Sequence, residues 1–250
     1  MTIFDALAPR YDTDFTQHPI GRMLRARVQA RLLKHFSVGD HLLELGCGTG
    51  EDACFLAKHG MTITATDAST AMCALAEEKN NRHEQVQVCM LDLAQLPDWN
   101  GHQFDGVFSN FGALNCLADW QPLAQWLSDK VPSGATVCLG IMAPFCAWEF
   151  MWHMIHGKFD IALRRVRGDD FGDLRITYPT IRRITDDFSP DFRRVHVSPL
   201  GLFLPTSGLF DVVQKRPRLM TTLSTLEKRF QDVSQLALFA DHYWIEFEKL

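Results

Sequence analysis

The sequence predicts an α/β protein whose core is a doubly wound sheet of mostly parallel strands with helices on both faces. Three observations lead to this fold class. The chain has 250 residues, 46% hydrophobic and 22% charged, which suits one large domain with additions. Short apolar runs alternate with helical patterns between residues 41 and 141, and strands that are apolar on both faces indicate a parallel sheet. After residue 142 the alternation stops.

The first half of the chain supplies most of the expected core. Apolar side chains recur every four residues from Ile20 to Leu32, which predicts an amphipathic helix over 20–36. The runs that follow predict strands at 41–45, 61–66, 86–90, 104–109 and 135–141, with helices at 51–59, 70–80 and 119–130. Together with the N-terminal helices, these elements are expected to form one domain over residues 1–142.

The second half is expected to complete the sheet and to add lids. Residues 145–159 and 206–231 have helical patterns, 160–190 are mixed, and 191–197 predicts a strand. In 241–248, alternating residues such as Ile245 and Glu246 predict a seventh strand, half-buried and antiparallel at the sheet edge, within a final segment 236–250. The insertions 145–190 and 198–235, inside 143–235, are expected as helical lids, because ligands of open α/β sheets bind beyond the strand ends.

The charge distribution disfavours a nucleic-acid substrate. Residues 35–150 hold 4 basic and 14 acidic side chains, and such a surface repels phosphate backbones. One basic cluster precedes this stretch, and its spacing spreads it around a helix, so we expect a solvated helix face. Its members are Arg22, Arg25, Arg27, Arg31 and Lys34.

The cysteines and the termini indicate a reduced, cytoplasmic protein. Seven cysteines without a CxxC pair fit neither a zinc knuckle nor a disulfide framework. The N-terminus lacks the pattern of a signal peptide, and the longest uncharged stretch, 131–148, is interrupted by proline and glycine. No membrane span is therefore expected, and the oligomeric state stays open.

A glycine-rich turn follows the first predicted strand and precedes a helix. It runs from Gly46 to Gly50 as GCGTG, and glycine allows positive φ and close approach of a ligand to the backbone. Glu51 and Asp52 come next, at the helix N-terminus where a pyrophosphate would have to sit. Since a dinucleotide motif also needs a small residue at position 51, the loop favours a cationic nucleoside without phosphate.

Two carboxylates follow at the ends of the next two predicted strands. Asp67 can accept hydrogen bonds from both hydroxyls of an unphosphorylated ribose. Asp92 can accept from the exocyclic amine of adenine, with Leu93 packing on the ring. Either acid alone is more often a helix cap or a solvated loop residue. Their joint position at successive strand ends is what indicates a nucleoside site.

Together these residues resemble the class I S-adenosylmethionine-dependent methyltransferases, in particular the branch that includes quinone-biosynthesis enzymes. The resemblance covers about residues 1–142. It rests on an N-terminal Phe4…Ala8…Tyr11-Asp12 motif, the LELGCGTG loop, Asp67-x-Ser69-x-x-Met72, Asp92-Leu93, and Phe104-Asp105…Ser109-Asn110-Phe111. After residue 142 the chain departs from the generic pattern, so the resemblance carries little information there.

The resemblance implies a Rossmann-like fold with S-adenosylmethionine as cofactor. It implies that Asp67 binds the ribose hydroxyls and Asp92 the adenine. Glu44 would reach the amino group, Asn110 would face the sulfonium, and Tyr11 would close over the methionine end. The full set implied to bind the cofactor is Tyr11, Glu44, Gly46, Cys47, Gly48, Gly50, Asp67, Ala68, Met72, Asp92, Leu93, Asn110 and Phe111.

The predicted helix 145–159 supplies candidates for the acceptor side. Apolar residues 145, 148, 152, 155 and 159 form one stripe, and Glu149, His153 and His156 fall on the adjoining face. His153 is the first candidate for a catalytic residue, and Tyr11 and His156 are the further catalytic candidates. The triplet also has metal-ligand spacing, but helix-surface polarity is the more common explanation and no metal is expected.

Other side chains are weaker candidates for contact with the acceptor. Tyr178 and His196 could reach it, and arginines such as Arg164 could recognise a carboxylate or phosphate, although surface ion pairs are the usual role of such runs. The aromatics Trp148, Phe150, Trp152, Phe203 and Phe210 suggest a flat or apolar acceptor, although stripes of this kind more often form core.

The sequence therefore predicts an enzyme that transfers a methyl group from S-adenosylmethionine to a small apolar or aromatic acceptor by in-line displacement. Two alternatives stay open at this point. One is a protein that binds the cofactor as a non-catalytic partner of another enzyme. The other is a nicotinamide-dependent oxidoreductase, which Glu51 disfavours.

Overall fold

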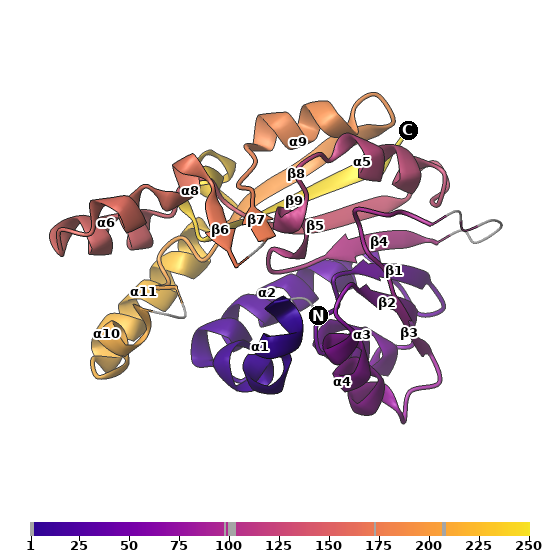
Figure 1. The fold of residues 1–250 in the computed structure, drawn as a ribbon, viewed down its shortest axis with the longest axis horizontal. Helices are drawn as coiled ribbons and strands as arrows, with labels where there is room; N and C mark the ends of the chain where they lie inside the picture. Colours follow the sequence, from indigo (N-terminus) through magenta and orange to yellow (C-terminus); the bar gives the residue numbers. More distant parts are fainter. Residues whose placement is uncertain (1–2, 98, 100–103, 173, 207–208) are drawn as a thin grey trace.

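The computed structural model describes residues 3–97, 99, 104–172, 174–206 and 209–250. Seven strands form one sheet in the order β3-β2-β1-β4-β5-β9-β8, and β6 pairs with β7 in a separate hairpin (Figure 1). The strands are β1 His41–Leu45, β2 Thr62–Asp67, β3 Val86–Met90, β4 Gly106–Ser109, β5 Thr136–Met142, β6 Asp169–Phe171, β7 Leu174–Ile176, β8 Phe192–Leu200 and β9 His242–Lys249.

The seven-stranded, mostly parallel sheet is confirmed. Strands β1 to β5 pair in parallel, and β9 runs antiparallel to both of its neighbours. The antiparallel direction of the C-terminal strand is as predicted. Its place is one strand further in, because β8 takes the edge and β9 inserts between β5 and β8.

The helices cover both faces of the sheet. Figure 1 shows α5 and α9 over one face and α1 to α4 over the other. The helices are α1 Ile3–Tyr11, α2 Pro19–His35, α3 Glu51–Lys58, α4 Thr70–Asn80, α5 Gln121–Ser128, α6 Ala147–Ile155, α7 Phe159–Ala162, α8 Arg164–Arg167, α9 Ile181–Phe188, α10 Asp211–Gln214 and α11 Pro217–Phe230. None of the helices among the described residues has the length and apolar character that crossing a bilayer requires.

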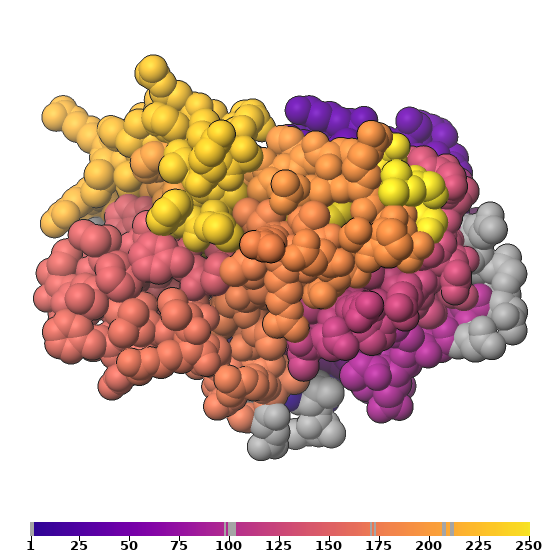
Figure 2. Space-filling model, turned by 90° about the horizontal axis from the view of Figure 1, so that it is seen from above, coloured from indigo at the N-terminus to yellow at the C-terminus, as the bar shows by residue number. Residues whose placement is uncertain are grey.

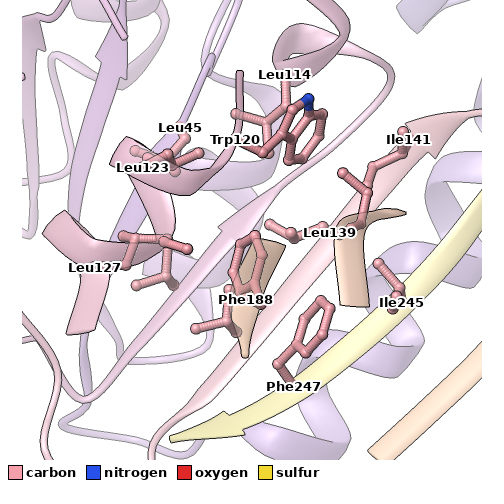
Figure 3. Packing of buried hydrophobic residues seen from close by; sticks show 14 of the residues in the cluster. Leu45, Leu114, Trp120, Leu123, Leu127, Leu139, Ile141, Phe188, Ile245 and Phe247 are labelled. Atoms are coloured by element: carbon pink, nitrogen blue, oxygen red, sulfur yellow. The ribbon is translucent and has the colours of Figure 1, made fainter. Parts of the chain in front are cut away.

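Two apolar clusters hold the layers together. On one face, Trp120 and residues of α5 and α9 pack on the central strands, and the ring of Phe188 stacks on Phe247 of β9 with centroids 4.5 Å apart (Figure 3). On the other face, Leu24 and Leu32 of α2 pack on the sheet with residues of α3. Both faces of the sheet are therefore covered.

Strand β9 is buried over its first six residues instead of half-buried. Alternate side chains of β9 face two different layers of the protein, one on each side of the sheet. Ile245 faces the cluster beneath α9, whereas Glu246 turns to α2 and accepts hydrogen bonds from Arg31 and Trp244 at 2.7 Å. His35 lies 3.1 Å from the same carboxylate. A polar residue in the alternation thus marks a buried ion pair and not a solvated face.

The expectation of a solvated basic face on α2 is wrong for three of its five residues. Arg25 is 8% exposed and binds Asp52 at 2.5 Å, while Arg27 binds Glu227 at 2.5 Å. Arg31 binds Glu246, as described above. The spacing of these arginines around the helix did not predict their exposure, because α2 is covered on several sides by α3, β9 and the C-terminal segment.

We predict that Glu246→Gln lowers the free energy of unfolding by about 3 kcal/mol at neutral pH, because it removes the buried carboxylate that binds Arg31 and leaves this arginine only its exposed partner Asp232, 3.5 Å away. Although burial would raise the pKa of Glu246, bonds from His35, Trp244 and Arg31 lower it to about 2. Its contribution is therefore present above its ordinary pKa of 4.5 and lost as the pH falls towards 2.

Denaturant unfolding across this pH range measures the effect. The matched control is Glu248→Gln on the same strand, whose side chain is 39% exposed and pairs only with Arg193 among the described residues. We expect it to cost less than about 1 kcal/mol. Equal losses in the two variants would contradict the account of β9.

Candidate functional site

A cavity of about 960 Å³ lies at the carboxyl ends of the parallel strands. Its wall combines α1, the turn after β1, the segments after β2, β3 and β4, and the β6–β7 hairpin. Of the thirteen residues implied to bind a cofactor, ten line it, namely Tyr11, Gly46, Gly48, Asp67, Ala68, Met72, Asp92, Leu93, Asn110 and Phe111. Glu44, Cys47 and Gly50 lie behind this lining and are buried.

The glycine turn between β1 and α3 is shaped by close approaches. Gly46 has a φ of 72°, and a Cβ there would lie 2.1 Å from the Cβ of Ala113. Gly50 has a φ of 73°, and its Cβ would lie 2.6 Å from Nδ2 of Asn80. Both positions therefore require glycine. Because the turn carries no side chains at these positions, its backbone reaches the cavity wall at Gly48.

Asp67 is held rigidly at the end of β2. The backbone N–H of Gly48 donates to Oδ2 at 2.8 Å, and that of Ser69 donates to Oδ1 at 2.9 Å. Burial raises the pKa of Asp67, and the same N–H donors oppose that rise. Asp67 also lines the cavity, so its carboxylate can accept a hydrogen bond from a ligand there.

A group of charged and polar side chains is buried behind the turn. Arg25 reaches from α2 to Asp52 at 2.5 Å, and Nδ2 of Asn110 donates to the same carboxylate at 2.9 Å. The Arg25 guanidinium also lies 4.8 Å from the ring centroid of Phe111. We did not predict from the sequence that Arg25 belongs to the site. Its position next to the apolar stripe of α2 was the feature that indicates burial.

Three atoms of this group have no hydrogen-bond partner among the described residues: Nε of Arg25, Oε2 of Glu44 and Oδ1 of Asn110. Burial raises the pKa of Glu44 well above its ordinary value, and the charge of Asp52 raises it further. Burial also raises the pKa of Tyr11, to about 12, so this hydroxyl stays protonated. Unpartnered buried polar atoms beside a cavity indicate a site for a polar ligand.

The β6–β7 hairpin forms the opposite wall, where apolar residues of β7 stand beside an ion pair between Asp169 of β6 and Arg164 at 3.3 Å. Leu174 and Ile176 line the cavity there, followed by Tyr178. Thr177 anchors this wall, because its N–H donates to Asn115 O at 2.8 Å and its hydroxyl donates to Leu117 O at 2.7 Å. Burial raises the pKa of Tyr178, so its hydroxyl is available as a donor at neutral pH.

Phe111 joins the two walls in a conformation that is rare for a residue with a side chain. Its φ is 52°, and it follows directly on the buried Asn110 at the end of β4. Left-handed backbone outside glycine is uncommon and clusters at functional sites. The ring packs on Phe15 with centroids 4.9 Å apart, which ties the N-terminal segment to the cavity wall.

Helices α6 to α8, which begin the first predicted insertion (145–190), contribute little to the cavity. Arg164 and the hairpin line it, whereas His153 on α6 and His156, directly after this helix, do not. The side chain of Glu149, predicted beside them, is buried and bound by Arg164 and by Arg165. Since that carboxylate turns inward to the arginines, the three side chains are not gathered into one site.

Of the other acceptor candidates, Tyr178 and Arg164 line the cavity and His196 does not. The aromatics proposed for the acceptor also lie outside the lining, namely Trp148, Phe150, Trp152, Phe203 and Phe210. Within the described ranges, one group of three side chains has metal-ligand donors within 4.8 Å, formed by His35, Cys138 and Glu246. Its carboxylate is already bound by Arg31 and Trp244.

Comparison with known proteins points to one family. A model described as a methyltransferase domain matches residues 42–129. A demethylmenaquinone methyltransferase of Clavibacter sepedonicus is 26% identical over 142 residues, which cover 57% of this chain and 58% of the relative. The chain thus spans about three fifths of the length of the curated relatives it matches first.

Solved structures share the fold at low identity. A chain from the complex of the Haloferax volcanii Trm112 methyltransferase activator with a methyltransferase has a TM-score of 0.66 at 14% identity, covering 100% of this chain and 98% of that one. The N-methyltransferase NodS of Bradyrhizobium japonicum WM9, solved with S-adenosyl-L-homocysteine, has a TM-score of 0.58 at 14% identity, covering 93% and 88%.

We predict that Glu44→Gln stabilises the ligand-free protein, and more so as the pH rises. With a raised pKa, folded Glu44 keeps its proton above the ordinary value of 4.5, where the unfolded chain releases it, so rising pH favours unfolding. Glutamine removes this penalty. Thermal unfolding from about pH 4 to about pH 8 measures the difference. A difference between variant and wild type that stays constant over this range would contradict the buried state of Glu44.

Proposed function

The cofactor domain of this chain is that of a class I S-adenosylmethionine-dependent methyltransferase, and from this premise we propose that it methylates a small acceptor bound beneath the β6–β7 hairpin. One observation carries the proposal. A single cavity runs from Asp67 and Asp92 at one end to Tyr178 and the apolar hairpin residues at the other. It has room for a nucleoside cofactor and a small acceptor together.

The residues of the first end fit S-adenosylmethionine. The Asp67 carboxylate, held in place by backbone N–H groups at the cavity wall, would accept from the ribose hydroxyls, and Asp92 with Leu93 would hold the adenine. The unpartnered Oδ1 of Asn110, which lines the cavity, matches the donors of an ammonium group. A cation bound there would also favour ionisation of the buried Glu44 behind the turn. When bound, this cofactor supplies an electrophilic methyl group on a sulfonium.

The chain's own contribution is alignment and exclusion of water. An in-line displacement needs donor and acceptor near van der Waals contact on a defined axis. Leu174, Ile176 and Leu117 supply an apolar wall that would hold a flat or apolar acceptor. The Tyr178 hydroxyl, protonated at neutral pH, would donate a hydrogen bond to an oxygen of that acceptor.

Tyr11 would act as an aromatic cover over the methionine end and not as a base. A Cβ at Gly48 would lie 3.6 Å from the Tyr11 ring, so the ring closes directly over the glycine turn. With a pKa of about 12 its hydroxyl does not accept a proton at neutral pH. A general base is not always needed for methyl transfer to an activated acceptor.

We predict that Asp67→Ala weakens binding of S-adenosylmethionine about 100-fold, because two charge-assisted hydrogen bonds to the ribose are lost. Titration calorimetry with purified protein measures this. Glu78→Ala, an exposed acid on α4, is the control and should bind as the wild type does. Wild-type protein that gives no binding heat would contradict the cofactor assignment, and enhanced fluorescence of a reduced nicotinamide would favour an oxidoreductase.

We predict that Tyr178→Phe slows methyl transfer at least about tenfold without changing affinity for the cofactor. His153→Ala, outside the cavity lining, should change neither. Release of S-adenosylhomocysteine with a panel of phenols, quinols, carboxylic acids and amines provides the assay. Cofactor binding without turnover on any acceptor would favour the non-catalytic binding protein, and a slow His153→Ala variant would return that histidine to the mechanism.

A further inference from the structure

Helices α6 to α8, residues 147–167, expose an unusual amount of apolar surface; we call this segment the helical arm. Twelve large hydrophobic residues are exposed in the described part of the chain, and six of them fall within sixteen residues of this arm. They are Met151, Met154, Ile155, Phe159, Ile161 and Val166. Ile155 is 74% exposed and Phe159 57%. Such clusters on a protein surface mark sites of interaction.

The arm is held in this orientation by its polar residues. Glu149, on α6, is only 4% exposed and binds Arg164 and Arg165. Arg165 in turn binds Asp241 at 2.5 Å and the backbone oxygen of Ala143. The helix therefore docks through a buried ion-pair network, and the opposite side, with Met151 and Ile155, is left to solvent. This arrangement reverses the usual burial of an amphipathic helix.

The surroundings of the arm are basic. Segments 147–167 and 209–230 together hold nine Lys and Arg against four Asp and Glu, whereas residues 35–142 hold four against thirteen. Lys158, Lys215, Arg216 and Arg218 are exposed and make no ion pair with the side chains that the structure describes.

The two basic segments lie at the same end of the molecule. Figure 1 shows α6 and α10–α11 projecting beyond the sheet on one side, and the view from above in Figure 2 places them side by side at that end. Contacts join them, since Trp148 donates to Phe203 O at 2.7 Å and the Phe203 ring packs on Phe230 of α11 at 5.4 Å. Apolar side chains and free cations thus share one surface.

We propose that this end of the molecule docks on a membrane surface that carries anionic lipids. Apolar side chains on short helices with lysine and arginine around them are what an interfacial helix presents to headgroups and acyl chains. The acidic body at residues 35–142 would be repelled by the same surface, so the charge asymmetry orients the protein with the arm towards the lipid. A symmetric pair of copies would instead bring two basic arms together.

The docking surface is continuous with the wall of the cavity. Arg164, which lines the cavity, lies within the arm two residues before the exposed Val166. The β6–β7 hairpin follows directly in the chain. Docking does not depend on methyl transfer, and it would bring the acceptor end of the cavity close to the lipid surface.

Flotation of the full chain with vesicles tests the proposal. With equal parts of phosphatidylcholine and phosphatidylglycerol we expect the protein to float with the vesicles, and with phosphatidylcholine alone we expect much weaker binding that falls further at high salt. The double variant Ile155→Ser with Phe159→Ser should lower the partition coefficient at least about tenfold. The matched control is Val38→Ser with Val195→Ser, also exposed but outside the arm, and should bind as the wild type does.

Three results would overturn the proposal. The first is that no wild-type protein is recovered with the anionic vesicles. The second is that the arm variant and the control bind equally. The third is that vesicle binding is absent and light scattering shows a dimer that the arm variant abolishes. The last outcome assigns the surface to self-association. Affinity for S-adenosylmethionine, measured on the same preparations, should be unchanged in both variants, which separates this test from that of the catalytic proposal.

Discussion

The tight turn between β1 and α3 is the constraint on which the site depends. Gly46 and Gly50 pass so close to Ala113 and Asn80 that no side chain fits at either position. Because the turn is thin, its backbone can donate to Asp67 on the neighbouring strand and leave a cavity in front. Behind it, the buried Arg25–Asp52 pair connects α2 to α3, so the N-terminal helices are part of the site and not an appendage.

The cavity has two ends of different character. The end proposed for the cofactor contains Asp67, Asp92 and Asn110, which stand at the carboxyl ends of three parallel strands. The end proposed for the acceptor is bounded by the β6–β7 hairpin, which Thr177 joins by hydrogen bonds to the backbone of Asn115 and Leu117. Under the proposed function, the hairpin determines which acceptor fits, while cofactor binding depends on the residues at the strand ends.

Local pattern predicted the parallel core closely, because each strand there is a short apolar run bounded by turn residues; the strand 41–45 and the helix 70–80 were placed at their observed bounds. The same pattern could not show which strands are neighbours, so β9 was expected at the edge. It also could not show that Glu149 turns inward to Arg164 and Arg165, since those pairs form only in the folded chain. The candidates His153 and His156 are not among the residues that line the cavity.

A crystal structure with S-adenosylhomocysteine bound tests the central claim most directly, namely that one cavity holds the cofactor at Asp67 and leaves its other end for the acceptor. The account predicts the ribose hydroxyls within hydrogen-bond distance of the Asp67 carboxylate, with the sulfur facing the space bounded by Ile176 and Tyr178. A nucleoside bound elsewhere, or a sulfur turned away from the hairpin, would contradict it.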